Sequence, residues 1–135
     1  RSKLPRNVVL WTDMMAGAGM ECPVTVKIGG TEIAIGSDGI ARLNSQNLAG
    51  STLTPPIQFQ NVLNWVPELS LARVIAMGTV NSARFLGLEK VLGTLSQGKR
   101  ANVTVFRHDA KTHAITVKAT IVHGKFLYPE ELREK

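Results

Sequence analysis

The chain has 135 residues, near the commonest size of a single domain, and 44% of them are hydrophobic, which is enough for a buried core and argues against disorder. Sixteen Lys and Arg against ten Asp and Glu give a net charge of +6, compatible with an anionic partner such as a phosphorylated metabolite. The basic residues are scattered along the chain rather than clustered. A solvated surface is therefore the simpler interpretation, and no nucleic-acid partner is expected.

The single cysteine and the lack of long apolar runs indicate the cellular compartment in which the protein is expected. Cys22 stands alone, which excludes an internal disulfide and favours a reducing environment. No apolar run approaches the roughly 20 residues needed to cross a membrane, and no charged-then-apolar leader precedes the first predicted strand. We therefore expect a cytoplasmic protein without a membrane partner. The chain begins at Arg1 rather than Met, which favours a piece of a longer protein.

The first third of the chain is predicted to be mostly strand and loop. Residues 7–11, "NVVLW", form a continuous apolar run that is typical of a strand covered on both faces, as in a parallel sheet. Thr12 and Asp13 follow directly and end the run. Residues 24–35 alternate apolar and polar side chains around Gly29-Gly30, which predicts a β-hairpin. Residues 37–53 are rich in Gly, Ser and Asn and are predicted to form a turn and a long loop.

The middle of the chain is predicted to be helical and the end to be strand. Thr54 is expected to cap a helix that ends at Pro67, and Ser70 a second helix. A third, short helix is predicted from Asn81 to a C-terminal cap at Gly87. The segments after it predict at least two further strands, with turns at Gly98 and Gly124.

Most residue types that carry chemistry are unfavourably spaced. His108, His113 and His123 lie at neither the helical nor the strand spacing that metal sites favour, so surface histidines are the better interpretation. Cys22 has no histidine near it in sequence to activate it. Asp13 remains, because the carboxyl end of a buried parallel strand is where α/β barrels hold their catalytic groups. An Asp that caps a helix or turn is the alternative.

Three segments carry a resemblance to a known family. These are "LWTDMMAGAGM" (10–20), "NLAGSTLT" (47–54) and "SLARVIAMGTVNSARFLGLEKVLGTLSQGKRANVTVF" (70–106). In this order they resemble N-acetylglucosamine-6-phosphate deacetylases of the amidohydrolase superfamily, over about residues 7–127. Met14 stands where that family usually has Ala, Ser82 where Pro is usual, and Asn102 where the superfamily commonly has Asp.

The resemblance implies an α/β fold. It would be the C-terminal part of a (β/α) TIM-like amidohydrolase barrel plus strands of a small β-sandwich. Residues 1–23 would supply the last barrel strand and the catalytic loop, and residues 24–53 the β-hairpin and a substrate-side loop. Residues 54–92 would form barrel-side helices, and residues 93–135 the C-terminal strands of the small β-sandwich.

The resemblance also implies an activity: removal of the acetyl group from N-acetylglucosamine 6-phosphate, giving glucosamine 6-phosphate and acetate. Asp13 would take a proton from metal-bound water and pass it to the leaving amine. A divalent metal, zinc or iron, is expected in the complete enzyme. The family's metal ligands, a Glu and histidines on earlier strands, have no counterpart here, so the chain alone is expected to bind no catalytic metal and to be inactive. The loop of Leu48, Ala49, Gly50 and Ser51 would line the substrate cleft or pack under the barrel mouth.

Other interpretations stay open at this level. The G-K-x-A-[DN] segment is shared across the superfamily, so another amidohydrolase acting on cyclic amides or nucleobases is an alternative. A small basic binding domain without catalysis is a second. An incomplete barrel would leave the apolar faces of residues 8–11 and of the helix through Val74 and Met77 uncovered. We therefore expect a homo-oligomer or a missing N-terminal portion to cover them.

Overall fold

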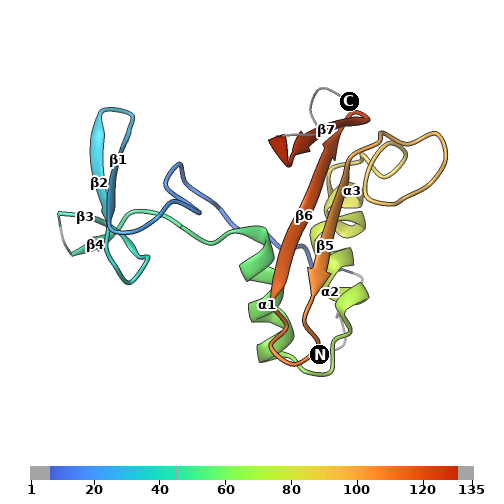
Figure 1. Ribbon diagram of the computed structural model, residues 1–135, viewed down its shortest axis with the longest axis horizontal. Helices are drawn as coiled ribbons and strands as arrows, with labels where there is room; N and C mark the ends of the chain where they lie inside the picture. The colour runs from blue at the N-terminus through green and yellow to red at the C-terminus, as the bar shows by residue number, and fades with distance from the viewer. Residues whose placement is uncertain (1–6, 45, 131–135) are drawn as a thin grey trace. The chain divides into compact units, whose positions relative to one another are not determined.

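The computed structural model describes residues 7–44 and 46–130 (Figure 1). Contacts between Cα atoms divide the chain into two compact units. One comprises residues 12–58, and the other comprises residues 1–11 together with residues 59–135.

The unit of residues 12–58 is built on the predicted hairpin. Strands β1 (Val24–Ile28) and β2 (Thr31–Ile35) pair antiparallel, with Ile28 opposite Thr31. Gly29 and Gly30, with φ of 56° and 86°, form the two-residue connection. Positive φ at both central residues matches the twist of the flanking strands and is accessible to glycine without strain. The hairpin prediction is therefore confirmed.

Two further strands follow where a long loop was predicted. β3 (Ala41–Leu43) pairs with β2, and the short β4 (Asn47–Leu48) pairs with β3, giving the sheet order β1-β2-β3-β4. The prediction of a loop over residues 37–53 is thus wrong in part. The predicted turn is present at Asp38-Gly39. It brings the chain back along the edge of β2, and β3 forms there because the backbone groups of an edge strand can pair with a further strand.

A small apolar core holds this sheet together. Ile33, Ile35 and Ala41 are buried. Five half-buried residues from the sheet and from neighbouring loops pack against them: Met15, Val24, Val26, Leu43 and Ala49. Ile35 keeps only 1% of its surface exposed. Met15 and Ala49 come from the two segments to which the resemblance assigns the site.

Helices dominate the middle of the chain, as predicted. α1 (Pro55–Trp65), α2 (Leu71–Gly78) and α3 (Val80–Phe85) follow one another. Ser70 occupies the N-cap position of α2, but its side chain makes no capping hydrogen bond; its carbonyl oxygen accepts from the backbone N–H of Val74 at 3.1 Å. α3 begins one residue earlier than predicted, with Thr79 at the N-cap, and Gly87 follows its C-cap.

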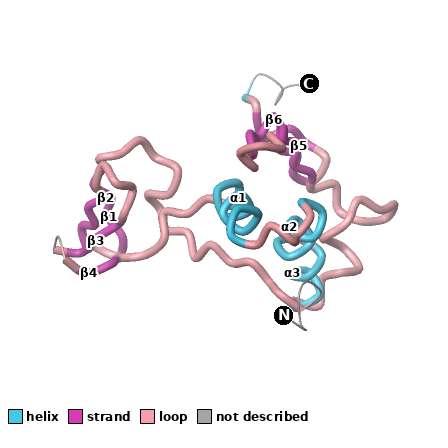
Figure 2. Tube along the Cα trace, turned by 90° about the horizontal axis from the view of Figure 1, so that it is seen from below, coloured by secondary structure: helices cyan, strands magenta, loops and turns pink. Residues whose placement is uncertain are grey.

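The C-terminal strands form a second sheet. β5 (Val103–His108), β6 (Ile115–Val122) and β7 (Lys125–Tyr128) pair antiparallel in that order. His123 and Gly124 connect β6 to β7. Figures 1 and 2 show α2 and α3 on one side of the β5-β6 pair. The core of this unit includes Leu63, Val74, Met77 and Ala83.

Residues 7–11 form no strand in the described part of the chain, where a strand was predicted. The backbone N–H of Leu10 donates to the carbonyl oxygen of Met77 at 3.2 Å, and the Asn81 side-chain amide donates to the carbonyl oxygen of Val8 at 2.8 Å. An apolar run becomes a strand only beside another strand, and residues 7–11 lie against helices within the described part of the chain. Trp11 is 74% exposed.

The predicted uncovering of the α2 face is also wrong. Val74 and Met77 keep 0% and 1% of their surface exposed. Within residues 7–44 and 46–130, the named strands pair only antiparallel, and a single parallel bridge joins Met14 to Ser51. The described residues therefore form a mixed α and β fold with antiparallel sheets, and they contain no barrel strand. Among them, no helix has the length and apolar character needed to cross a membrane.

Asn102 in the shared superfamily segment closes the β6-β7 connection. Its Oδ1 accepts the backbone N–H of His123 at 2.9 Å, and Gly124 N–H donates to the carbonyl oxygen of Ala101 at 3.0 Å. Asn102→Ala is expected to lower the free energy of unfolding by about 1 kcal/mol, because the His123 N–H loses its acceptor. Urea unfolding measures this. Asn102→Asp keeps an acceptor oxygen and should restore most of the loss; equal losses would contradict the role.

Candidate functional site

Asp13 lies in a loop rather than at the end of a strand, and its backbone conformation is unusual. Its φ is 49°, in the left-handed region, and its side chain is exposed. Asp tolerates this region better than most residues because its short polar side chain can bond locally. Residues held in sparsely populated conformations concentrate at functional sites, where surrounding structure imposes the geometry. The question is therefore what holds the backbone around Asp13.

The residues after Asp13 make backbone hydrogen bonds to the predicted substrate loop. Met14 and Ser51 form a parallel β-bridge, and the backbone N–H of Met15 donates to the carbonyl oxygen of Ser51 at 2.9 Å. The Met15 side chain packs against the core of the sheet. The structure thus places Met14 and Met15, which follow Asp13, beside a loop that lies more than thirty residues away in sequence.

The four predicted substrate-loop residues have different environments. Leu48 belongs to β4 and is 75% exposed, whereas Ala49 packs on the core and donates its N–H to the carbonyl oxygen of Ala41 at 3.0 Å. A Cβ on Gly50 would lie 3.3 Å from the sulfur of Met15, so the two segments are in close contact there. Ser51 Oγ accepts the N–H of Leu53 at 3.1 Å, which leaves the hydroxyl proton free to donate.

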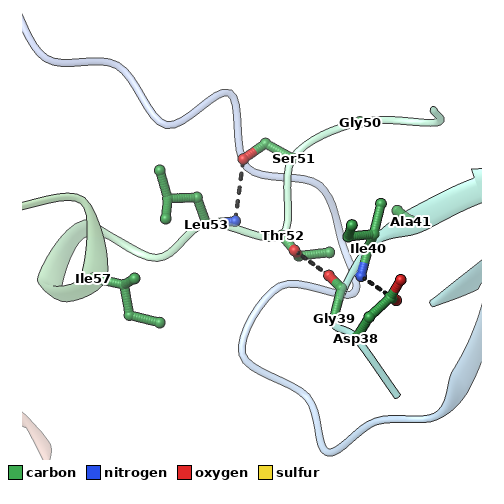
Figure 3. Close-up of a pocket in the computed structure, with 9 residues that line it drawn as sticks. All are labelled: Asp38, Gly39, Ile40, Ala41, Gly50, Ser51, Thr52, Leu53 and Ile57. Atoms are coloured by element: carbon green, nitrogen blue, oxygen red, sulfur yellow. Dashed lines mark hydrogen bonds between the residues drawn. The ribbon is translucent and has the colours of Figure 1, made fainter. Parts of the chain in front are cut away.

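An open pocket of about 380 Å³ adjoins this loop (Figure 3). Gly50 and Ser51 line it, together with the residues around the Asp38-Gly39 turn and the chain leading into α1: Ile40, Ala41, Thr52, Leu53 and Ile57. The Thr52 hydroxyl donates to the carbonyl oxygen of Gly39 at 2.6 Å, which joins the two walls. Asp13, Leu48 and Ala49 are not among the residues that line this open pocket.

One ion pair borders the pocket. Arg42 Nη2 lies 2.8 Å from Asp38 Oδ2, and Asp38 Oδ1 accepts the N–H of Ile40 at 3.0 Å. The hydrogen bond from the Arg42 side chain, and then that from Ile40, lower the pKa of the Asp38 carboxyl below its ordinary value. Both groups are solvent-exposed, so the pair orients the turn more than it stabilises the fold.

This ion pair leads to a pH prediction. A carboxyl with a lowered pKa in the folded state stabilises the fold above its unfolded pKa of about 3.9, and that stabilisation is lost as the pH falls through the folded pKa. Arg42→Gln is expected to raise the pKa of Asp38, as followed by NMR titration of carboxyl carbons. Asp109 serves as the control because backbone N–H groups of Thr112 and Lys111 chiefly lower its pKa. An unchanged Asp38 titration would contradict the assignment.

The residues present do not by themselves fit the divalent ion that the resemblance implies. In the part of the chain that the structure describes, no group of three or more His, Cys, Asp or Glu side chains converges on a common point. Asp13 is a single carboxylate, and one carboxylate does not hold a transition metal firmly.

Sequence reasoning missed two features that the fold creates. The turn signal of "SDG" was recognised, but its position against Thr52 across the pocket depends on the pairing of β3 and was not predicted. His108 and His113 were assigned separately to the surface, whereas their ring nitrogens lie 3.4 Å apart. A spacing of five residues matches neither helix nor strand periodicity, so only the hairpin loop brings the two rings together.

Comparison with known proteins defines the class. The chain belongs to the amidohydrolase family, whose model matches residues 26–128. A putative N-acetylgalactosamine-6-phosphate deacetylase of Escherichia coli K12 is 38% identical over 97 residues, which are 72% of this chain and 56% of that protein. A 5-methylthioadenosine/S-adenosylhomocysteine deaminase of Desulforudis audaxviator is 35% identical over 97 residues, 71% of this chain and 22% of its own length.

Solved structures agree with this assignment. The N-acetyl-D-glucosamine-6-phosphate deacetylase of Mycobacterium smegmatis, solved as a mutant with N-acetyl-D-glucosamine-6-phosphate, has a TM-score of 0.70 at 29% identity over 90% of this chain and 30% of that one. The deacetylase of Thermotoga maritima has a TM-score of 0.68 at 28% identity, over 88% and 30%. The resemblance indicated by the three motifs is therefore confirmed. The chain spans about half the length of the E. coli K12 relative and under a third of these structures.

Proposed function

We propose that this chain is the C-terminal part of a metal-dependent amidohydrolase that removes the acetyl group from N-acetylglucosamine 6-phosphate, with Asp13 as its acid and base. The observation that carries the proposal is the bridge between Met14 and Ser51. It joins the backbone that follows Asp13, a residue of unusual backbone conformation, to Ser51, which lines a pocket. The names of the deacetylase relatives support the reaction class.

The reaction needs one proton to move twice. The Asp13 carboxylate accepts a proton from the attacking water as the water oxygen bonds to the acetyl carbonyl carbon. The same proton then passes to the sugar nitrogen as the C–N bond breaks, which releases acetate and the free amine. General acid–base groups of this kind commonly contribute a rate factor of about 100 to 10,000. The left-handed backbone at Asp13, fixed by Met15 on the core, limits the positions open to the carboxylate.

The substrate loop is proposed to position the sugar. Leu48 offers an exposed apolar surface, and Ser51 Oγ has a proton to donate to a sugar oxygen. Ala49 packs on the same core as Met15, and Gly50, which has no side chain, lets the loop approach Met15 closely. The loop would then orient the sugar so that its acetyl group lies in a reactive position relative to the carboxylate.

The remainder of the complete enzyme is proposed to supply what this chain lacks. Residues 7–11 would pair as the last strand of a TIM-like barrel once neighbouring strands are present, and β5 to β7 would join a small β-sandwich. A divalent ion, zinc or iron, would be held by residues of that remainder and would make the attacking water acidic. Trp11, 74% exposed, would be covered there or by a second copy in a homo-oligomer.

An assay of the complete enzyme on several substrates tests the reaction. We expect acetate release from N-acetylglucosamine 6-phosphate. Its epimer N-acetylgalactosamine 6-phosphate serves as the comparison substrate in the same assay. Ammonia release from 5-methylthioadenosine, or ring opening of a cyclic amide, would instead assign another amidohydrolase reaction. Salt-dependent binding to DNA without any hydrolysis would favour a basic binding domain. The isolated chain is expected to release no acetate, even with added zinc.

A further inference from the structure

His108 and His113 form a pair of imidazoles that the proposed reaction does not use. His113 Nδ1 and His108 Nε2 lie 3.4 Å apart, the ring planes differ by 16°, and the ring centroids are 5.6 Å apart. The centroids are farther apart than the nitrogens, so the rings meet at their nitrogen edges rather than overlapping face to face. Both residues are half-buried.

The loop between β5 and β6 is firmly built, so the pair is preorganised. Asp109 N–H donates to the carbonyl oxygen of Ala114 at 3.0 Å, and Asp109 Oδ1 accepts the N–H groups of Lys111 and Thr112 at 2.8 and 2.9 Å. The Gln60 side chain in α1 donates to the carbonyl oxygen of Thr112 at 3.1 Å. These bonds hold the loop in which His113 has a φ of 57°, and its ring nitrogen lies close to that of His108, which ends β5.

We propose that His108 and His113 bind a late first-row divalent ion such as Zn²⁺, Ni²⁺ or Cu²⁺ through these two nitrogens. Two zinc–nitrogen bonds of about 2.0–2.1 Å at a tetrahedral angle place their nitrogens about 3.4 Å apart. That is the separation found here. Each ring has only to tilt so that both lone pairs point to one position, and the second side-chain torsion of histidine is broad enough to allow it.

The chemistry of the pair selects the ion. Imidazole nitrogen suits Zn, Cu and Ni, whereas Mg²⁺ and Ca²⁺ take oxygen ligands. Binding replaces the proton of the N–H···N hydrogen bond, since both nitrogens must present lone pairs to the ion. The Asp109 carboxylate follows His108 in sequence and accepts the backbone N–H groups of Lys111 and Thr112. Arg107 in β5 and Lys111 in the loop are the neighbouring cationic residues in sequence. Water fills the other coordination positions.

Zinc titration of the chain by calorimetry tests the proposal independently of any catalysis. The Cys22→Ser background is used because Cys22 is an exposed thiol that would itself bind zinc. We expect one equivalent of zinc to bind and magnesium not to compete. Loss of one ligand should weaken binding by at least about tenfold, since even outer-shell partners contribute that much. The ligand variants are His108→Gln and His113→Asn.

His123→Asn is the matched control. His113 and His123 both have left-handed φ, 57° and 51°, which Asn tolerates, so the two substitutions put the same demand on the backbone. Zinc affinity should fall for His113→Asn and stay unchanged for His123→Asn. Imidazole ¹⁵N resonances of the Cys22→Ser chain give a second measurement that needs no ligand variant: zinc should shift Nε2 of His108 and Nδ1 of His113. No zinc binding to that chain, or equal shifts at His123, would overturn the proposal.

Discussion

Asp13→Asn in the complete enzyme is expected to lower kcat by about a hundredfold or more while leaving the fold intact. Asn matches Asp in size and tolerates the left-handed φ of 49°, so the loop and its bridge to Ser51 should persist. Asn cannot accept the proton of the attacking water, and therefore both proton transfers lose their carrier. Steady-state acetate release measures kcat, and circular dichroism checks the fold.

Asp109→Asn provides the control for this substitution. It changes the same functional group in the β5-β6 loop, where the carboxylate serves backbone N–H groups. We expect its kcat to match the wild type. Wild-type turnover in Asp13→Asn would instead show that Asp13 shapes a turn, the alternative that its position in the sequence left open.

Gly93→Ala is expected to give the largest loss of stability. Gly93 has a φ of 91°, and a Cβ there would lie 2.8 Å from the Cα of Val80 and 2.9 Å from the Cβ of Ala83. The backbone of α3 cannot move aside as a flexible side chain would. Backbone strain and overpacking together should cost about 3 kcal/mol or more, seen as a fall in Tm of roughly 10 °C.

Gly98→Ala separates the two causes. Gly98 has a similar φ of 85°, but nothing lies within 4 Å of a Cβ built there. This variant should therefore show only the backbone strain, of order 1 kcal/mol. Equal losses of Tm in the two variants would mean that the contact with Val80 and Ala83 contributes nothing.

Asp13 shows how a candidate residue can be proposed on a local structure that the described residues do not contain. The motif around Asp13 was recognised from the sequence, but the strand predicted before it is absent from the described residues. The residues that follow Asp13 are fixed instead: Met15 packs on the core, and Met14 forms the bridge to Ser51. Whether residues 7–11 become a strand depends on backbone partners, which an apolar run does not supply itself.

The sequence by itself determined those elements whose causes are local. Gly29-Gly30 between alternating runs was sufficient for the β1-β2 hairpin, and the prolines and helix formers of residues 55–85 were sufficient for three helices. Only the tertiary structure decided which distant segments meet. The approach of residues 13–15 to Ser51 depends on the packing of β2 and β3, and that of His108 to His113 on closure of the β5-β6 hairpin. The physical reason is that local preference acts over a few residues, whereas these contacts require backbone pairing and burial between segments far apart in the chain or across a loop.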